Sequence, residues 1–526
     1  MDLHPLVTFE LQHLLVRTSE NVQRRVSGLT AGLLGLAALA LVHAPGSVQA
    51  ATGPTTYAKA YRNVVNNIAY DASPADVKAT LDGGSVVLGL TQAPAGPGVS
   101  WLMKLDSLGN PKWQREVGCF KTPPGSYADA VSVQPTTDGG YAIGGGTVGC
   151  GSQSICPALS GIQCAVLEKL DSTGNLLWAR VYEAGQASSG FNSIRQTADG
   201  GYIAAGSTTN VHQNTGALVI KLDGLGGVQW RRQLGPSGST QAYLDAVIQT
   251  SDGGFVATGD YHVPSASAPR TNVLVVRLDR LGNLLWQRGL GGVDSTGSPN
   301  AVAQSMSIVQ TSDGGFAAAG TWTNSFLPGQ CCAGALLVKL DSTGRIQWQR
   351  AYSGGVYCYS NGFSETCTTI DGVVYSVHQT AGGGYLLAGD ARLELSDSAP
   401  IEPWLAGVDA AGNLLWQYLY YQVYKPTGRP LSEYFASSAP SIDGGLVATG
   451  FTENYQLQKG EIFGVKTDSA GLAGSCSDVH PATPLNAIDP GLSPLAPSLA
   501  LTSAAVPAAT STSKSAATSV VVQTDC

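Results

Sequence analysis

Two segments of this chain place a carboxylate beside polar residues that could transfer protons or bind a sugar. The first is Asp260 with Tyr261 and His262, and the second is Asp390 with Arg392 and Glu394. Two carboxylates with a nearby imidazole or guanidinium group can act as general acid and base on a glycosidic bond. The catalytic candidates are therefore Asp260, His262, Asp390 and Arg392, and the binding candidates include Tyr261 and Glu394. The alternative is that all of them are solvated loop charges, because exposed Asp and Glu are the norm.

Three tryptophans stand outside the repeated motif that holds the other indoles of the chain. They are Trp101, Trp322 and Trp404. We expect them near the same face as the two acids, where aromatic rings could stack on sugars or simply pack in a core.

An internal repeat organises the chain around these residues. A turn of the form Asp-Gly-Gly, followed by an apolar strand, recurs along the chain, and Gly382 takes the Asp place in a seventh copy. Its acids are Asp82, Asp138, Asp199, Asp252, Asp313 and Asp443. Each copy is followed by an Asp-x-x-Gly turn, and in all but the last a Trp lies seven residues after that Asp. These are Trp113, Trp178, Trp230, Trp286, Trp348 and Trp416.

Each repeat has the pattern of four short antiparallel strands. Alternating residues precede Asp-Gly-Gly, which forms a tight hairpin because Gly readily adopts the positive φ that the turn needs and Asp tolerates it. A four-stranded sheet that is apolar on both faces cannot be buried alone, whereas a ring of such sheets buries both faces. The sequence therefore predicts an all-β, seven-bladed β-propeller.

The ends of the repeat region predict how the ring closes. The seventh repeat lacks its Trp strand after Asp468, whereas the segment from Tyr57 to Tyr61 precedes the first repeat without a blade of its own. We expect this N-terminal strand to be donated to the last blade as its outer strand.

The Asp-x-x-Gly-x-x-x-Trp element resembles the tryptophan-docking motif of the PQQ-like propeller superfamily. The repeat as a whole resembles the Asp-Gly-Gly and Lys-Leu-Asp repeat propellers of exported bacterial and archaeal proteins. The resemblance covers about residues 57 to 475 and concerns the fold, since propellers host many unrelated activities. Quinoprotein dehydrogenases usually have eight blades and a docking motif one residue longer, so no cofactor is predicted from it.

Loop lengths predict which face of the ring carries function. The two hairpin turns of each repeat are short and constant, whereas the other two connections vary in length and lie on the opposite face. The ten cysteines are expected in these variable loops and tail, as disulfides that stiffen them. They are Cys119, Cys150, Cys156 and Cys164; Cys331, Cys332, Cys358 and Cys367; and Cys476 and Cys526. The pairing stays open. Cys331 and Cys332 could form a vicinal disulfide with each other, or each could pair with Cys358 or Cys367.

The two ends of the chain differ in composition from the repeats. Residues 1–50 resemble a secretory signal peptide, with Arg24 and Arg25 before an apolar run and small residues ending at Ala50. Residues 51–475 are the predicted propeller. Residues 476–526 are rich in Pro, Ala, Ser and Thr, and we expect this tail to be extended or disordered, with a Cys476–Cys526 bridge able to fold it back.

Composition narrows the function classes. Only 13% of the residues are charged and the net charge is −8, with no basic patch, which excludes a nucleic-acid partner. No metal site is predicted, and we expect a monomer, secreted or periplasmic or at the cell surface, without a transmembrane span after signal cleavage. The leading hypothesis is a binding or adhesion module that recognises a glycan or protein through its variable loop face. The alternatives are a polysaccharide hydrolase or lyase and, third, a PQQ-dependent oxidoreductase.

Overall fold

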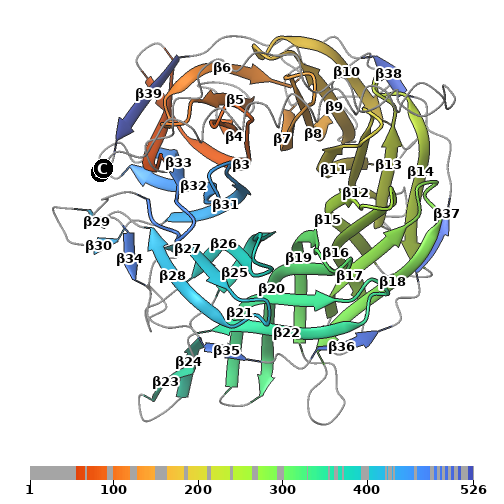
Figure 1. Cartoon of the computed structure of the whole chain (residues 1–526), viewed down its shortest axis with the longest axis vertical. Coiled ribbons are helices and arrows are strands. Elements are labelled where there is room, and N and C mark those ends of the chain that lie inside the picture. Colours follow the sequence, from red (N-terminus) through yellow and green to blue (C-terminus); the bar gives the residue numbers. More distant parts are fainter. Residues whose placement is uncertain are drawn as a thin grey trace, which may run out of the picture. The chain divides into compact units, whose positions relative to one another are not determined.

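The computed structural model describes one compact unit, from Pro54 to Cys526. Within it the described residues are 55–524, except 66–67, 92–98, 119–126, 149–162, 183–187, 210–214, 237–240, 264–269, 293–300, 328–329, 354–355, 361–364, 370–371, 392–401, 421–422, 425–428, 431–432, 455–458, 474–478, 482–485, 489–491, 496–498, 503–507 and 511–518. These residues form strands and turns without a helix. Seven four-stranded antiparallel blades stand in a ring, as the repeats predict (Figure 1).

Each blade runs from an inner strand at the ring axis to an outer strand at the rim. Blade 1 is β3 (Ala72–Ala79), β4 (Ser85–Thr91), β5 (Val99–Leu105) and β6 (Pro111–Val117). Blade 2 is β7 (Tyr127–Pro135), β8 (Tyr141–Val148), β9 (Cys164–Leu170) and β10 (Leu176–Tyr182). Blade 3 is β11 (Ser188–Gln196), β12 (Tyr202–Thr209), β13 (Thr215–Leu222) and β14 (Val228–Pro236). Blade 4 is β15 (Gln241–Gln249), β16 (Phe255–Val263), β17 (Arg270–Leu278) and β18 (Leu284–Gly292).

The remaining blades follow the same order. Blade 5 is β19 (Ala301–Gln310), β20 (Phe316–Leu327), β21 (Gln330–Leu340) and β22 (Ile346–Ser353). Blade 6 is β25 (Gly372–Gln379), β26 (Tyr385–Ala391), β27 (Glu402–Val408) and β28 (Leu414–Tyr420). Blade 7 is β31 (Glu433–Pro440), β32 (Leu446–Asn454) and β33 (Lys459–Lys466), with β1 (Tyr57–Val65) paired against β33. Short accessory strands are β2 (Ile68–Tyr70), β23 (Val356–Ser360), β24 (Glu365–Thr369), β29 (Val423–Tyr424) and β30 (Arg429–Pro430).

The register of β1 brings the two ends of the repeat region together. Tyr57 lies opposite Lys466, and Tyr61 lies opposite Ile462. Tyr61 also donates its hydroxyl hydrogen to the carbonyl of Gly109 in blade 1, at 2.8 Å. Tyr182 makes the same contact with Gly226 from the outer strand of blade 2. Strand β1 thus contacts blade 1 in the same way as the outer strand of blade 2 contacts blade 3.

Trp docking joins the blades near their outer edge. Trp230 of blade 3 lies over Gly282 of blade 4, so close that a Cβ on Gly282 would stand 2.8 Å from the ring. The indole also meets Phe255 edge-on, with ring centroids 5.6 Å apart, and Arg232 lies over its face. Tyr57 takes the place of the indole over Gly109 at the junction between blades 7 and 1. Positive φ and ring contact together require glycine at these turns.

The Asp of each Asp-Gly-Gly turn pairs with a buried cation on the third strand of the same blade. Asp82 accepts from Lys104 at 2.9 Å, and Asp252 pairs with Arg277. Blade 6 has Gly382 in place of the Asp and Gly407 in place of the cation, so both partners of the ion pair are replaced. The recurrent Asp of the Asp-x-x-Gly turns accepts backbone N–H groups of its own turn, as Asp106 does from Leu108 and Asn110.

The C-terminal tail follows the rim of the ring in short strands. After blade 7 it pairs in turn with the outer strands of blades 6, 5, 4, 3 and 2, and finally with β1. These strands are β34 (Val479–Pro481), β35 (Asn486–Ile488), β36 (Leu492–Leu495), β37 (Leu499–Thr502), β38 (Ala508–Thr510) and β39 (Ser519–Thr524). The tail is therefore extended, as predicted, but its backbone covers the outer edges of blades, which otherwise expose unpaired N–H and C=O groups. The proposed Cys476–Cys526 bridge lies outside the described residues.

Candidate functional site

The two catalytic candidates Asp260 and Asp390 each join neighbouring blades. Asp260, on β16, accepts the backbone N–H of Ser305 in blade 5 at 3.2 Å. Asp390, on β26, accepts the backbone N–H of Phe435 in blade 7 at 2.9 Å. Both side chains are buried. They lie on blades 4 and 6, with blade 5 between them, so the structure does not bring them together as a pair.

These acids have unusual protonation for a simple structural reason. Burial raises the pKa of Asp260 to about 7, and the nearby Asp245 carboxyl adds to the rise. Burial likewise raises the pKa of Asp390 to about 7, against hydrogen bonds from Tyr375 and Phe435. A catalytic role for either remains a prediction, but the backbone hydrogen bonds already account for a carboxyl at each position.

The remaining candidates are half-buried, buried or outside the described residues. His262 Nδ1 lies 2.9 Å from the hydroxyl of Thr271, and burial lowers the pKa of its imidazole. Tyr261 is buried in the core shared by blades 3 and 4. Arg392 and Glu394 lie outside the described residues.

Trp101, Trp322 and Trp404 are core residues. Trp101 is 1% exposed, Trp322 5% and Trp404 0%, each within a hydrophobic cluster between blades. β-strand alternation turns all three side chains inward, and a role for them in sugar binding stays a prediction. Packing, the other option in the sequence, holds for all three.

The cysteines are not confined to loops. Cys164 begins β9, is completely buried and is not a free thiol. Cys331 and Cys332 lie in β21, and Cys358 lies directly opposite Cys367 in the β23–β24 ribbon. The expectation that the cysteines lie in the loops is therefore wrong for Cys164, Cys331 and Cys332, which belong to blade strands, whereas Cys358 and Cys367 lie in a ribbon between blades 5 and 6. Cys119, Cys150, Cys156, Cys476 and Cys526 lie outside the described residues, and the pairing of all ten stays a prediction.

The axis of the ring holds a cavity of about 380 Å³. Its wall is built from the inner strands of the blades, each of which carries one β-bulge. The bulged residues are Ala75, Val131, Asn192, Asp245, Met306, Tyr375 and Ala436, and all of them line the cavity. A bulge adds one residue to a strand and re-aims its side chain. The seven bulges therefore form one level of the channel wall.

Residues just after the bulges bind each blade to the next. The Ser132 hydroxyl accepts the backbone N–H of Ile194 at 3.2 Å, and Ser376 accepts that of Ser438 at 3.0 Å. Blade 4 has Ala246 at this place, and Asp260 supplies another hydrogen bond to blade 5. Of the two acids that depart from the repeat, Asp260 thus lies in the blade where the inner hydroxyl is missing, whereas Asp390 lies in blade 6, which has Ser376.

In blade 1 the corresponding residue is Asp76, which is the most heavily hydrogen-bonded carboxylate of the channel. It accepts from the Ser437 hydroxyl at 2.7 Å, the Val133 backbone N–H at 3.0 Å and the Lys78 ammonium. Burial by itself would raise the pKa of Asp76, but the charges of Lys78 and Arg195 and these hydrogen bonds lower it below the usual value. Asp76 is therefore ionised and fully engaged.

Two residues farther along the inner strands, cations from separate blades line the cavity. Lys78 comes from blade 1 and Arg195 from blade 3. Burial lowers the pKa of Lys78 to about 8, Asp76 opposes this shift, and the Arg195 charge adds to it. The Arg195 guanidinium donates to its neighbouring backbone carbonyl at Ile194, at 2.8 Å. The channel thus holds two cations against one adjacent anion.

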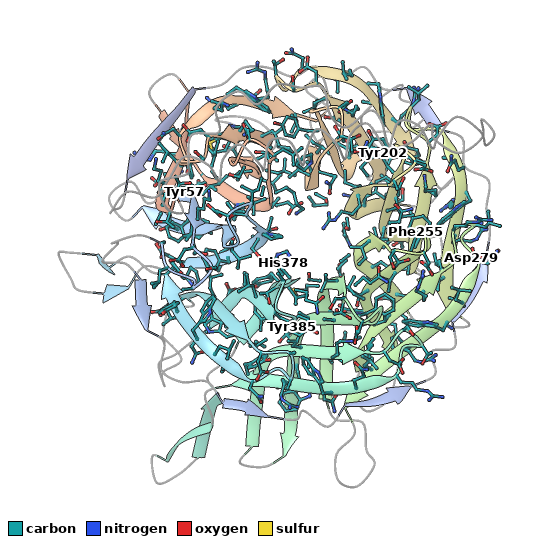
Figure 2. All side chains as sticks on the ribbon, in the orientation of Figure 1. Tyr57, Tyr202, Phe255, Asp279, His378 and Tyr385 are labelled. Atoms are coloured by element: carbon teal, nitrogen blue, oxygen red, sulfur yellow. The ribbon has the colours of Figure 1, made fainter. Side chains whose placement is uncertain are left out.

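His378 stands on the same level from blade 6, at the inner wall of the ring (Figure 2). Its Nε2 lies 3.1 Å from the carbonyl oxygen of Ser438, to which it donates. Burial and the charges of Lys78 and Arg195 lower the pKa of His378 to about 4. The imidazole is therefore neutral at pH 7 and adds no positive charge.

A second hollow opens beside the channel on the hairpin face, between blades 7, 1 and 2. It measures about 790 Å³ and shares Lys78, Ala439 and Pro440 with the axial cavity. Two apolar side chains stand exposed at its rim, Leu81 at 94% and Ile442 at 70%. We call this hollow the hairpin-face groove. The hairpin turns around it have the constant length that the repeats predict, so the groove comes from the side chains beside them.

A missing glutamine explains where the groove lies. In blades 3 to 6 the inner strand ends in a Gln that accepts a backbone N–H from the preceding blade's turn, as Gln249 does from Ala198 at 2.8 Å. The other three are Gln196, Gln310 and Gln379. Blades 7, 1 and 2 have Pro440, Ala79 and Pro135 at this position. The shorter side chains leave space between turns, and all three line the groove.

Sequence reasoning missed the channel residues Asp76, Lys78, Asn192, Arg195, Asp245 and His378. A signal was present in part, since aligning the repeats shows charged residues at inner-strand positions that other blades fill with Ile248, Val309 or Ala439. Within the described residues, no group of three His, Cys, Asp or Glu side chains is placed to hold a metal ion. That part of the chain also contains no helix of the length and apolar character needed to cross a membrane.

Comparison with known proteins gives structural similarity only. No protein-family model and no curated protein matches the sequence. Among solved structures, the polysaccharide lyase Uly1 is similar with a TM-score of 0.46 and 8% identity, over 77% of this chain and 94% of that one. The exotype rhamnogalacturonan lyase YesX gives 0.32 and 12%, over 80% and 76%. The tail fiber of Staphylococcus aureus phage P68 gives 0.22 and 9%, over 82% and 95%. At these values the similarities carry no argument about the activity of this chain.

Proposed function

We propose that this protein is an exported binding module that takes the end of a glycan chain into its axial channel. The observation that carries the proposal is the cavity of about 380 Å³, lined by Lys78, Arg195, Asp245, Asn192 and Tyr375. A concave site with a few convergent polar groups is the usual form of a small-ligand site, and this volume lies at the small end of the range. It suits one or two sugar rings better than a protein surface.

We infer that the ligand enters the channel from the hairpin face. The groove shares Lys78 with the cavity, and its exposed Leu81 and Ile442 offer apolar surface for the less polar faces of sugar rings. The variable loop face proposed from the sequence lies largely outside the described residues. Binding there stays a prediction.

A panel of soluble oligosaccharides, scored by isothermal titration calorimetry, tests the channel site. Val131→Trp places an indole into the channel from the bulge of blade 2, and we expect it to abolish binding. The matched control is Leu177→Trp, which adds the same ring at an exposed position on β10. Binding that survives Val131→Trp unchanged, in a protein with the same melting temperature, would rule out the channel.

One observation favours a polysaccharide-active enzyme as a second candidate. Burial raises the pKa of Asp245 to about 6, against a hydrogen bond from Asn192, and this carboxyl lines the cavity. An acid that titrates near neutral pH suits general acid or base catalysis. Product release from the same panel, lost in Asp245→Asn while binding is retained, would establish the enzyme. Asp260→Ala and Asp390→Ala test the predicted pair in the same assay.

A further inference from the structure

The charged groups of the channel are separated into levels. Lys78 and Arg195 lie three residues beyond the bulged residues Ala75 and Asn192 along their strands, nearer the hairpin face. Asp245 lies on the bulge level itself, where the Asn192 amide donates to it at 3.1 Å. The described contacts of Asp245 include no cation. A ligand in the cavity therefore meets positive charge at the hairpin end and hydrogen-bonding groups farther in.

The positive charge of the hairpin end is not neutralised by the protein. Asp76 is the one carboxylate that the described contacts place against these cations, and its oxygens already accept from Ser437, Val133 and Lys78. His378 beside them is neutral at pH 7. At this end of the cavity two cations and one anion leave a net charge of about +1, whereas Asp245, with a pKa of about 6, is largely ionised at pH 7 and makes the bulge level negative.

We propose that the channel recognises a carboxylate carried by a sugar-sized ligand, with the carboxylate between Lys78 and Arg195 and the ligand's hydroxyls against Asp245 and Asn192. The inference rests on the proposed function and deepens it by naming the ligand class as an acidic saccharide. A guanidinium offers paired N–H donors that match the two oxygens of a carboxylate. A neutral sugar would leave the net positive charge of the hairpin end uncompensated.

The arrangement favours an acidic sugar over a bare inorganic anion. An inorganic anion satisfies the cations but makes no use of Asp245 and Asn192, and it fills little of the cavity. A sugar acid can bind the two cations with its carboxylate and contact Asp245 and Asn192 with its hydroxyls at the same time. Removing the carboxylate charge while keeping the ring is therefore the sharpest change of ligand.

The test measures binding of D-glucuronate, its uncharged methyl ester and inorganic sulfate by calorimetry at pH 7 and low ionic strength. We expect D-glucuronate to bind at least tenfold more tightly than the ester or sulfate. Lys78→Met and Arg195→Met should each weaken glucuronate binding at least tenfold and leave the ester unchanged. Lys112→Met is the matched control, since it removes the same charge from an exposed groove lysine, side chain 53% exposed, outside the axial cavity.

A variant of opposite sign separates recognition from damage to the fold. Asp76→Asn removes the neutralising anion and also the charge that holds up the pKa of Lys78, so this variant is measured at pH 6, where glucuronate should bind several-fold more tightly even if the melting temperature falls. Equal binding of the acid and its ester, or no loss in either cation variant, would overturn the carboxylate site. If Val131→Trp still abolishes binding of a neutral oligosaccharide in that case, the proposed channel function stands without it. Sulfate binding as tight as glucuronate would also overturn the sugar-acid proposal.

Discussion

Blades 3 to 6 and blades 7, 1 and 2 use one repeat to make two different surfaces. In the first group, a Gln at the end of each inner strand binds the turn of the blade before it, so the hairpin face is closed there. In the second group Ala79, Pro135 and Pro440 stand at the same place, and the groove opens beside the channel. We call these the latched arc and the open arc. The difference shows that a ring of near-identical units can gain a groove when three neighbouring blades each lack one side-chain hydrogen bond.

The largest expected effect concerns the junction between blades 7 and 1, where the outer strand of blade 7 is the N-terminal β1, held to β33 by strand pairing, and Ala79 stands in place of the linking Gln. A Cβ at Gly109 would stand 2.8 Å from the Tyr57 ring, at a φ of +75°. Gly109→Ala should therefore cost about 2–4 kcal/mol in the free energy of unfolding, from backbone strain and overpacking together. Chemical denaturation followed by circular dichroism measures it.

Two controls place this value in context. Gly314 has a φ of +79° with nothing near its Cβ position, so Gly314→Ala should cost only about 1 kcal/mol. Gly282→Ala disturbs an equivalent docked ring at the junction of blades 3 and 4, which also has the Gln249 link. If Gly282→Ala lowers the free energy of unfolding more than Gly109→Ala does, the junction between blades 7 and 1 is not the weak point of the ring.

The repeat could be predicted from the sequence because each signal is local. Asp-Gly-Gly fixes a hairpin within three residues, and Asp-x-x-Gly with its Trp fixes the next turn and the contact to the following blade. The position of Tyr57 also followed from counting strands, since one outer strand was missing at the end of the repeat region. These features repeat, and repetition separates them from chance.

The site could not be predicted in the same way because its residues do not repeat. Lys78, Arg195 and His378 meet only because three separate blades face one axis. The bulges that set their level leave no mark in the alternating pattern. Asp260 and Asp390 did stand out as departures from the repeat. In the structure each carboxyl binds the neighbouring blade. A departure from the repeat alone does not distinguish a structural carboxyl from a catalytic one.

Protonation provides the second test, because each arc borders one buried acid. Asp390 joins blades 6 and 7, and Asp260 joins blades 4 and 5. Each has a folded-state pKa of about 7, raised by burial above the usual aspartate value of 3.8. Between about pH 4 and pH 7 the folded state holds protons that the unfolded state has released. Stability should therefore fall as pH rises through this window and level off above it.

An amide keeps the hydrogen-bond acceptor and removes the titration. At pH 8 Asp390→Asn should be more stable than the parent by about 1–3 kcal/mol, and the gain should vanish near pH 4. Asp260→Asn should behave in the same direction, with a smaller gain because its junction also has a Gln link. Thermal melts from pH 4 to pH 8 measure both. A parent protein whose stability rises across this window would contradict the assignment of buried, protonated acids.

A smaller effect concerns ligand binding and the Lys78 ammonium. Its pKa of about 8 reflects burial and the Arg195 charge, opposed by Asp76, and His378 across the channel is already neutral. Raising the pH from 7 to 9.5 should therefore discharge Lys78 and weaken glucuronate binding several-fold. Arg195 stays charged in this range, so binding should not vanish. In Lys78→Met this pH dependence should disappear, and a slope that persists there would assign it to another group.

The smallest expected effect converts one arc into the other. Gln249→Ala removes an acceptor from the Ala198 backbone N–H and should cost about 0.5–1.5 kcal/mol. Ala79→Gln supplies the missing side chain beside the exposed turn residue Ile442 and should stabilise the protein by a similar or smaller amount. Because that side chain also fills the groove next to Lys78, it should slow glucuronate association while leaving the channel residues intact. Stopped-flow binding measures the rate, and an unchanged association rate in a stabilised Ala79→Gln would show that ligands reach the channel from the opposite face.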